Sequence, residues 1–357
     1  MHLLNRVEAI AVAARGFPWL GDLTPSSIQR WIGLELGTLL DANTPQIYGD
    51  HHCSARALSP ILHVVSGNTP HAGIQSLTRG ILVGGTNRVK LPRQGLPEFD
   101  HFVRLLPAEL QPETSNSLQA AWMEEAEAII VFGSDETVEF FAKHVSPRQR
   151  LLAYGHKVSL GLVLDSFDTN VIEGAVRDVL VFDQLGCLSP QLFYVAGDSA
   201  EFAKGLAERF NELFLSDSAV TEWTSEIAGS LRSCREEWKF RAATEPGILV
   251  WESPENLDWL VIHDPNPDLV ANPLYRTIFV KPMPAQLQTV LSPIRRQIST
   301  IGIDPVNSEF ANLATQLGAQ RVCPIGRMQK PAVTWHHDGG PTLASLVRFV
   351  DIEGLDN

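Results

Sequence analysis

Short apolar runs that end at turns and lead into helix-forming stretches constrain the fold of this chain most strongly. Residues 128–132 are entirely apolar, Gly133 and Ser134 interrupt them, and residues 135–144 have the composition of a helix. A short apolar run bounded by turn residues is typical of a strand buried on both faces of a parallel sheet. The same alternation of strand-like and helical stretches recurs at 158–164, 170–180, 191–195 and 200–215. Strands and helices alternating in this way predict βαβ units and an α/β fold.

The length and the composition predict two globular lobes. A chain of 357 residues exceeds what one hydrophobic core usually holds, and 44% hydrophobic with 19% charged residues is a globular composition. The strand–helix pattern breaks near residues 153–157 and then starts again. We therefore expect two α/β lobes, each with a mostly parallel sheet, that meet near this segment.

The charge balance and the four cysteines restrict the partners and the compartment. A net charge of −13 argues against nucleic acid or an anionic membrane as a partner, because both require clustered Lys and Arg. The four cysteines are widely separated, which is typical of a reduced, intracellular protein. No apolar run approaches the ~18–20 residues of a membrane-spanning helix. We therefore expect a cytoplasmic protein without a membrane span.

A cysteine directly after a glycine is the first candidate for catalysis. Gly186 and Cys187 follow the apolar run 179–182. Such a turn presents a thiol beside backbone N–H groups, which is the arrangement that attack on a carbonyl group requires. A free cysteine is also among the most buried residue types and commonly acts as a small hydrophobe. From the local sequence, both interpretations of Cys187 remain open.

Three other turns carry residues suited to anion or oxyanion binding. The Gly133-Ser134 turn opens a predicted helix whose first N–H groups attract phosphate, although Ser134 also suits a helix cap. Asn68 lies on a turn after a strand, where its amide suits an oxyanion, although Asn is also a common turn residue. Lys90 and Arg93 lie at another strand end, where they suit a phosphate or a ribose edge or remain solvated.

Two histidine clusters resemble metal ligands at first sight. They occupy residues 51–53 and 336–338. Adjacent residues on one segment rarely reach the same ion, and no complementary set with zinc-like spacing accompanies them. We therefore expect no metal site, and we interpret residues 335–340 as a packed loop near the site or the domain interface.

Taken together and in order, these pieces resemble the acyl-CoA reductase branch of the aldehyde dehydrogenase superfamily, the long-chain fatty-acyl-CoA reductases of bacterial bioluminescence. The resemblance extends from about His63 to Val350. The segments that carry it are 63–70, 89–93, 131–135, 154–157, 183–190, 322–326 and 335–339. It implies an aldehyde-dehydrogenase-like fold, with a cofactor-binding domain at 1–155 completed by 335–357 and a catalytic domain at 156–334.

The resemblance implies a role for each candidate residue. Cys187 matches the catalytic thiol, and Asn68 matches the oxyanion-hole amide. Lys90 matches the lysine at the adenosine ribose, and Gly133 with Ser134 matches the turn that faces the pyrophosphate.

Position 93 bears on the choice of cofactor. Family members that use NAD often carry a glutamate three residues after the lysine. Arg93 stands there in this chain and favours a 2′-phosphate. We therefore expect NADPH, with NADH as the alternative.

Three departures from the family pattern accompany these matches. Hydrolytic aldehyde dehydrogenases carry a water-activating glutamate where this chain has Ala153, so the thioester intermediate is expected to persist until it is reduced. Val138 replaces a glycine of the phosphate-facing helix turn, which leaves the cofactor pose open. The glutamate that usually holds the nicotinamide ribose has no clear counterpart, although 272–278 is the corresponding region.

His156, beside the turn between the lobes, is a proton shuttle in one interpretation and structural in the other.

These features predict NADPH-dependent reduction of a fatty acyl-CoA to the aldehyde through a thioester on Cys187. One alternative is an acyl carrier or acyltransferase that uses the same cysteine without hydride transfer. Another is a non-catalytic scaffold with the same fold. As partners, the resemblance implies an acyl-CoA or acyl-protein thioester substrate and a homodimer or an acyl-donor protein.

Overall fold

The computed structural model describes residues 1–40, 45–216 and 223–354, which divide into two compact units. Unit 1 comprises Met1–His156 with Lys330–Asn357, and unit 2 comprises Lys157–Gln329. The boundaries expected from the sequence were 155/156 and 334/335, so six residues assigned to the second domain, His156 and 330–334, belong to unit 1. No described helix is long and apolar enough to cross a membrane.

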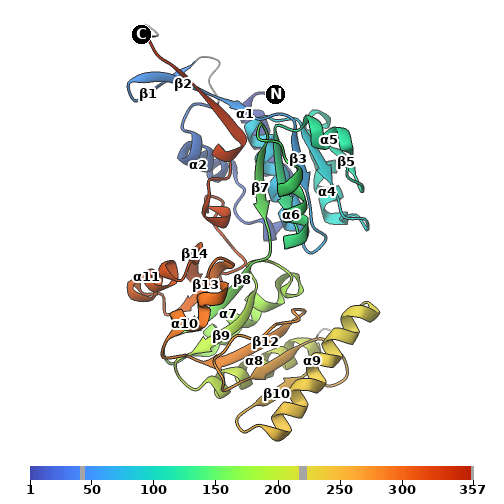
Figure 1. Ribbon diagram of the computed structural model, residues 1–357, viewed down its shortest axis with the longest axis vertical. Helices are drawn as coiled ribbons and strands as arrows, with labels where there is room; N and C mark the ends of the chain where they lie inside the picture. The colour runs from blue at the N-terminus through green and yellow to red at the C-terminus, as the bar shows by residue number, and fades with distance from the viewer. Residues whose placement is uncertain (41–44, 217–222, 355–357) are drawn as a thin grey trace. The chain divides into compact units, whose positions relative to one another are not determined.

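A parallel sheet forms the centre of unit 1 (Figure 1). Its strand order is β5-β4-β3-β6-β7, and every neighbouring pair is parallel. The strands are β3 (Ile61–Val64), β4 (Asn87–Lys90), β5 (Glu113–Ser115), β6 (Ala128–Phe132) and β7 (Arg150–Tyr154). Their carboxyl ends therefore lie along one edge, which is where ligands usually bind in parallel α/β sheets.

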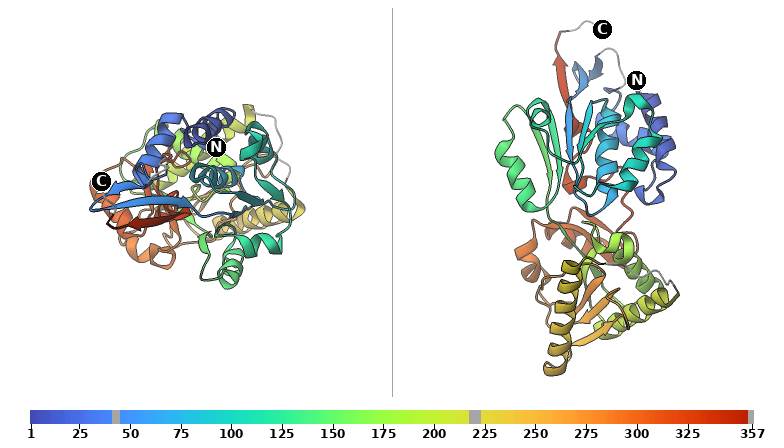
Figure 2. Two further views of the ribbon diagram at one scale, coloured as in Figure 1. Left: turned by 90° about the horizontal axis from the view of Figure 1, so that it is seen from above. Right: turned by 90° about the vertical axis from the view of Figure 1, so that its right-hand side faces the viewer.

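Helices cover both faces of this sheet, as Figure 2 shows. One face packs on α1 (Leu3–Ala14), α2 (Pro25–Leu36), α3 (Pro70–Val83) and α4 (Pro97–Leu105). The other face packs on α5 (Ala120–Glu125) and α6 (Asp135–His144). Strands buried on both faces account for the uniformly apolar sequence of β6.

A second, smaller sheet in unit 1 pairs residues 46–57 with residues 347–352. Its antiparallel strands are β1 (Gln46–Tyr48), β2 (His51–Ala57) and β15 (Val347–Ile352), in the order β1-β2-β15. The C-terminal segment thus completes unit 1 by pairing with β2.

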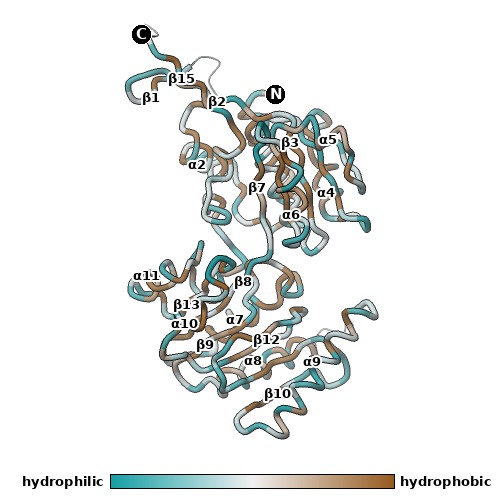
Figure 3. The backbone as a smooth tube through the Cα atoms, viewed as in Figure 1, coloured by the Kyte–Doolittle hydropathy of each residue, from teal (hydrophilic) through white to brown (hydrophobic). Residues whose placement is uncertain are grey.

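Unit 2 contains a larger, mostly parallel sheet with the order β10-β11-β12-β9-β8-β13-β14, in which only β10 is antiparallel among the described strands. The strands are β8 (Val158–Val163), β9 (Pro190–Val195), β10 (Leu249–Glu252), β11 (Leu260–His263), β12 (Thr277–Pro282), β13 (Ile298–Asp304) and β14 (Arg321–Pro324). The central strands β9 and β12 are largely hydrophobic, as Figure 3 shows. The predicted α/β class with mostly parallel sheets is confirmed.

Helices cover both faces of this sheet as well. α7 (Thr169–Leu180) and α8 (Ser199–Ser216) pack on one face. α9 (Ser225–Thr244), α10 (Leu287–Leu291) and α11 (Ser308–Gln316) pack on the other.

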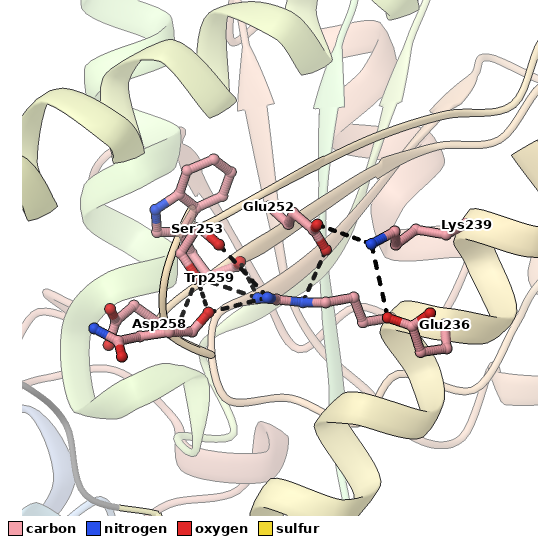
Figure 4. Close-up of polar contacts among 8 residues, drawn as sticks. Glu236, Lys239, Glu252, Ser253, Asp258 and Trp259 are labelled. Carbon is pink, nitrogen blue, oxygen red and sulfur yellow. Dashed lines mark hydrogen bonds and ion pairs between the residues drawn. The ribbon is translucent and has the colours of Figure 1, made fainter.

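Polar contacts fasten α9 to the edge strand β10 (Figure 4). The Arg235 guanidinium forms an ion pair with Glu252 at 3.1 Å and donates to the Ser253 hydroxyl at 3.1 Å. Lys239, one turn further along α9, also reaches Glu252 at 3.1 Å. These ion pairs anchor a helix that buries only Leu231 and Trp238.

Candidate active site

A constrained turn presents Cys187 just before β9. Phe182, Asp183 and Gln184 have φ values of 54°, 53° and 64°, in the left-handed region that side-chain-bearing residues rarely adopt. The buried Gln184 amide holds the turn by donating to the carbonyls of Pro190 and Thr277, both at 2.8 Å. Three successive residues in this conformation persist only where the surroundings fix them.

The backbone at Cys187 is fixed from the neighbouring strand. The Ser159 hydroxyl on β8 donates to the Cys187 carbonyl at 2.7 Å, and the Ser189 N–H donates to the Gly186 carbonyl at 3.0 Å. A Cβ on Gly186 would lie 3.3 Å from the Ser189 hydroxyl, so the close turn favours glycine. The Cys187 side chain is half-buried. The thiol is therefore held on a fixed turn without being sealed in the core.

Burial raises the pKa of the other three thiols. It raises the pKa of Cys234 and of Cys323 to about 11, and it also raises the pKa of Cys53. A thiol must lose its proton to act as a nucleophile. These three cysteines are therefore poorly suited to catalysis at neutral pH.

A buried polar cluster lies beside the cysteine turn. Burial lowers the pKa of Arg321 on β14, while the charges of Cys323, Asp178 and Cys187 act in the opposite direction. The guanidinium is thus close enough to Cys187 to interact with it electrostatically, and a nearby cation favours the thiolate form of a cysteine. The Gln329 amide links this cluster to the turn by donating to the Ser189 hydroxyl at 2.8 Å.

The sequence analysis missed this supporting cluster. Arg321 is far from Cys187 in the sequence and comes close because β14 pairs with β13, which pairs with β8. No local motif marks it. The Arg321 side chain also donates to the Met328 carbonyl at 2.7 Å, so it has a structural role in the loop after β14.

The predicted residues of unit 1 lie at the carboxyl edge of its sheet. Asn68 lies in the loop from β3 to α3, and its side chain is exposed. Lys90 is the half-buried last residue of β4, and Arg93 lies exposed in the turn that follows. Among the residues that the structure describes, no carboxylate is within ion-pairing distance of Lys90 or Arg93. The sheet thus brings these three side chains to one edge, without acidic partners for the two cations.

The Gly133-Ser134 turn lies at the same edge and begins α6. Ser134 caps the helix by accepting from the Thr137 N–H at 3.4 Å. The Ser134 hydroxyl also holds the pKa of Glu136 below its usual range. Asp135 accepts from the His156 N–H at 2.8 Å. The first turn of α6 therefore contains two carboxylates, and the Ser134 oxygen is already used as a cap.

Ala153 and His156 lie on and just after β7, and both are exposed. Ala153 offers no base at the position where hydrolytic relatives carry glutamate. The His156 backbone is fixed to Asp135, whereas its imidazole is exposed.

The histidines of the two clusters contact neighbouring side chains of unit 1. His51 lies 3.0 Å from Asp50 and 3.2 Å from Asp351, which joins β2 to β15. His337 is buried and packs against the rings of Tyr154 and Trp335. Within residues 1–40, 45–216 and 223–354, no three His, Cys, Asp or Glu side chains gather closely enough to hold a metal ion. The packed-loop interpretation of residues 335–340 agrees with the burial of His337.

The donors along this edge can be compared with the needs of a dinucleotide. Lys90 and Arg93 supply two cations without carboxylate partners, which suits a ribose that carries a 2′-phosphate. The N-terminus of α6 offers N–H groups and a favourable dipole, but its two acids compete for them. The residues present therefore fit the adenosine end of the cofactor better than its pyrophosphate.

Comparisons with known proteins support the resemblance. The model of the acyl-CoA reductase (LuxC) family matches residues 106–349. A long-chain acyl-protein thioester reductase of Aliivibrio fischeri is 23% identical over 359 residues, covering 94% of this chain and 73% of the relative. The protein of the same name from Vibrio harveyi is 24% identical over 349 residues, covering 92% and 71%.

Solved structures share the fold. The bifunctional proline utilization A protein has a TM-score of 0.74 at 14% identity, and the match covers 99% of this chain and 43% of that chain. Aldehyde dehydrogenase 21 from Physcomitrella patens has a TM-score of 0.71 at 11% identity, covering 99% and 86%. The predicted aldehyde-dehydrogenase-like fold is thereby confirmed. With a family model matching more than half of its length, this chain belongs to the acyl-CoA reductase (LuxC) family.

Proposed function

We propose that this protein reduces a fatty acyl thioester, with acyl-CoA as the direct substrate, to the aldehyde at the expense of NADPH. Its membership of an acyl-CoA reductase family supports the reaction class. The observation that carries the assignment to Cys187 is its position on a fixed turn, and burial raises the pKa of the other three thiols. The related bacterial proteins are named for acyl-protein thioesters, which makes an acylated protein the alternative donor.

In the first step, the Cys187 Sγ attacks the carbonyl carbon of the acyl thioester as a thiolate. The Asn68 amide and the Cys187 backbone N–H donate hydrogen bonds to the oxyanion of the tetrahedral intermediate. The intermediate collapses with cleavage of the bond from carbon to the CoA sulfur. CoA leaves as a thiolate, and because thiols have a pKa of about 8.5 it needs no strong general acid.

The acyl group then remains on Cys187 until it is reduced. Ala153 provides no carboxylate to activate water, which protects the thioester from hydrolysis. When bound, NADPH supplies the hydride that converts the enzyme thioester to the aldehyde level. Lys90 and Arg93 hold its adenosine end, and Arg93 selects the 2′-phosphate. The net reaction consumes one NADPH and one proton for each aldehyde and each CoA thiol released.

His156 is the candidate proton carrier. Its imidazole is exposed, while its backbone is fixed by Asp135. We propose that it exchanges the proton taken up when Cys187 is regenerated.

A product balance tests this function. Purified protein is mixed with acyl-CoAs from hexanoyl- to palmitoyl-CoA, and with the same acyl groups carried on a protein thiol. NADPH consumption, free CoA, aldehyde and fatty acid are all measured. The proposal predicts equal amounts of NADPH oxidised and aldehyde formed, with little acid. CoA release without NADPH oxidation would indicate acyl transfer, and acid as the main product would indicate hydrolysis, so either result would overturn the proposal.

A further inference from the structure

Two left-handed turns precede the neighbouring parallel strands β9 and β12. The first comprises residues 182–184 and leads directly to Cys187. In the second, Leu274, Tyr275 and Arg276 have φ values of 67°, 52° and 63°. None of these residues is a glycine, so each conformation is unfavourable unless its surroundings enforce it. Both turns therefore depend on supporting contacts from the rest of the chain.

An ion pair joins the two turns directly. The Arg276 guanidinium donates to Asp183 Oδ1 from two nitrogens, Nε at 3.0 Å and the terminal Nη2. Two donors on one rigid guanidinium fix the orientation of the carboxylate, whereas a lysine would supply a single point charge. The Gln184 amide adds a second link, since it donates to the Thr277 carbonyl at 2.8 Å. Each turn therefore holds the other in its left-handed conformation.

Arg276 is itself held by burial and by aromatic rings. It is only 8% exposed. Its guanidinium carbon lies 5.1 Å from the ring centroid of Phe214 and 5.3 Å from that of Trp223, which are cation–π distances. The guanidinium also donates to the Asp258 carbonyl at 3.3 Å. With its side chain enclosed on several sides, Arg276 presents a fixed partner to Asp183.

The first left-handed turn continues into the turn that carries the thiol. The Leu185 N–H donates to the Phe182 carbonyl at 2.9 Å, and the Ser189 N–H donates to the Gly186 carbonyl at 3.0 Å. These two hydrogen bonds make one compact segment of the left-handed residues and the cysteine. A displacement of the left-handed turn would therefore move Cys187.

We propose that Arg276 is a positioning residue for Cys187: by locking the two left-handed turns together, it holds the Sγ atom where it meets the acyl carbonyl. The inference rests on the proposed function, because this position matters only if Cys187 attacks a substrate. Arg276 is assigned no contact with substrate or cofactor. Its effect is expected on the rate of the chemical step, since misplacing a reacting group by about 1 Å can cost about 10²-fold in rate.

Amide hydrogen exchange tests the lock without substrate or cofactor. Arg276→Gln is expected to speed exchange at the Leu185 and Ser189 amides at least about tenfold, because the turn opens more often. The matched control is Arg235→Gln, at a comparably buried arginine of unit 2 that pairs with Glu252 of β10. It should leave these amides as slow to exchange as in the wild type. Unchanged exchange in Arg276→Gln would overturn the lock.

Steady-state kinetics tests the consequence for the reaction. Arg276→Gln is expected to lower kcat about 10- to 100-fold while KM for acyl-CoA changes less than about twofold. Arg276→Lys should recover only part of the loss, because it supplies one donor in place of two. Arg235→Gln should lower the melting temperature but keep the wild-type kcat. Equal loss of kcat in Arg276→Gln and Arg235→Gln would show a structural role only and overturn the proposal.

A double-mutant cycle shows whether Arg276 acts through Asp183. Asp183→Asn is expected to lower kcat as much as Arg276→Gln, and the double variant should fall no further, because all three lack the same contact. Multiplied effects would mean that the two residues act separately, which would overturn the proposal. A wild type without reductase activity would refute the proposed function instead, and the exchange measurement would still decide whether the lock exists.

Discussion

The cysteine turn of unit 2 and the strand ends of unit 1 differ in how the chain satisfies their polar groups. Around Cys187, Gln184 donates to two carbonyls, Ser159 holds the Cys187 carbonyl, and Gln329 reaches Ser189. At the strand ends of unit 1, Asn68 and Arg93 extend from exposed loops. The turn in unit 2 is thus fixed by the chain itself, whereas the edge of unit 1 leaves its donors open.

This difference matches two separate requirements of the proposed reaction. A nucleophile must keep its position through attack and release, and a network of internal hydrogen bonds provides that. Groups that bind a ligand must instead remain unpaired until it arrives. Substitutions in unit 2 should therefore affect stability and chemistry together, and those at the edge of unit 1 should affect chemistry or cofactor choice alone.

Replacing the nucleophile should have the largest effect. Cys187→Ala is expected to lower the rate of aldehyde formation by about 10⁴-fold or more, since removal of a catalytic nucleophile has effects of this size. Steady-state NADPH oxidation with acyl-CoA measures it. Cys234→Ala, at a thiol whose pKa burial raises to about 11, should retain activity. A comparable loss of activity in both variants would contradict the assignment of the catalytic role to Cys187 alone.

Removing the oxyanion donor should rank second. Asn68→Ala is expected to lower kcat by about 10²–10³-fold, the usual effect of deleting one such donor. Because Asn68 is exposed, the melting temperature should hardly change. Asn5→Ala, at an exposed position of α1, is the control. A wild-type kcat in Asn68→Ala would exclude the assigned role.

The buried His63 should make stability sensitive to acid. Burial mainly lowers its folded pKa from 6.5 to about 4. As the pH falls below 6.5, the unfolded chain takes up the proton first, so stability is full above that pH and is lost on the way to pH 4. The expected loss at about pH 4 is about 3 kcal/mol, at 1.36 kcal/mol per pKa unit.

Urea unfolding at neutral pH and at about pH 4.5 measures this loss. His63→Gln should show a shallower dependence on pH than the wild type, while His101→Gln, at an exposed histidine, should show the same dependence. Identical slopes in wild type and His63→Gln would contradict the prediction.

Removing a support of the cysteine turn tests whether substitutions in unit 2 affect stability and chemistry together. Gln184→Leu removes the Gln184 donor from the buried Pro190 carbonyl and leaves the Thr277 carbonyl with the Asn272 amide, so it should cost about 1–3 kcal/mol of stability. It should also lower kcat, because the turn that carries Cys187 loses its support. Chemical denaturation and steady-state assays measure both effects, with the exposed Gln288→Leu as the control. A variant with the stability and the kcat of the wild type would mean that the turn is not held by Gln184.

The smallest effect is expected at Arg93. Arg93→Glu should shift the preference from NADPH towards NADH by about tenfold, because a carboxylate repels the 2′-phosphate and accepts from ribose hydroxyls. Stability should be unchanged at this exposed position. The ratio of kcat/KM for the two cofactors measures the shift. An unaltered ratio would remove Arg93 from the cofactor site.

Much of the fold was predictable because its strands are apolar and its turns are marked. The predicted helix at 135–144 coincides with α6, and the predicted strand at 128–132 coincides with β6. By contrast, β13 was missed because Ser299, Thr300 and Gly302 interrupt its apolar pattern, although all three are buried. α9 was missed because it buries only Leu231 and Trp238, so its sequence has no regular apolar stripe.

In the candidate site as well, only the residues that stand in local motifs could be predicted from the sequence. Cys187 and Asn68 stand in local motifs, and the roles assigned to them from those motifs remain predictions. The supports of the cysteine turn do not stand in motifs. Gln184 and Arg321 act through strand pairings between distant segments, and the left-handed backbone at Phe182 and Asp183 has no glycine to announce it. Tertiary contacts of this kind leave no local sequence pattern.

Intact-mass analysis of the acylated protein tests the central claim most directly. Wild-type protein and Cys187→Ala are mixed with acyl-CoA, and each is then measured before and after NADPH is added. The account predicts one acyl group on the wild type, none on Cys187→Ala, and loss of the adduct as aldehyde once NADPH is present. An adduct that persists in NADPH, or that forms equally on Cys187→Ala, would contradict it.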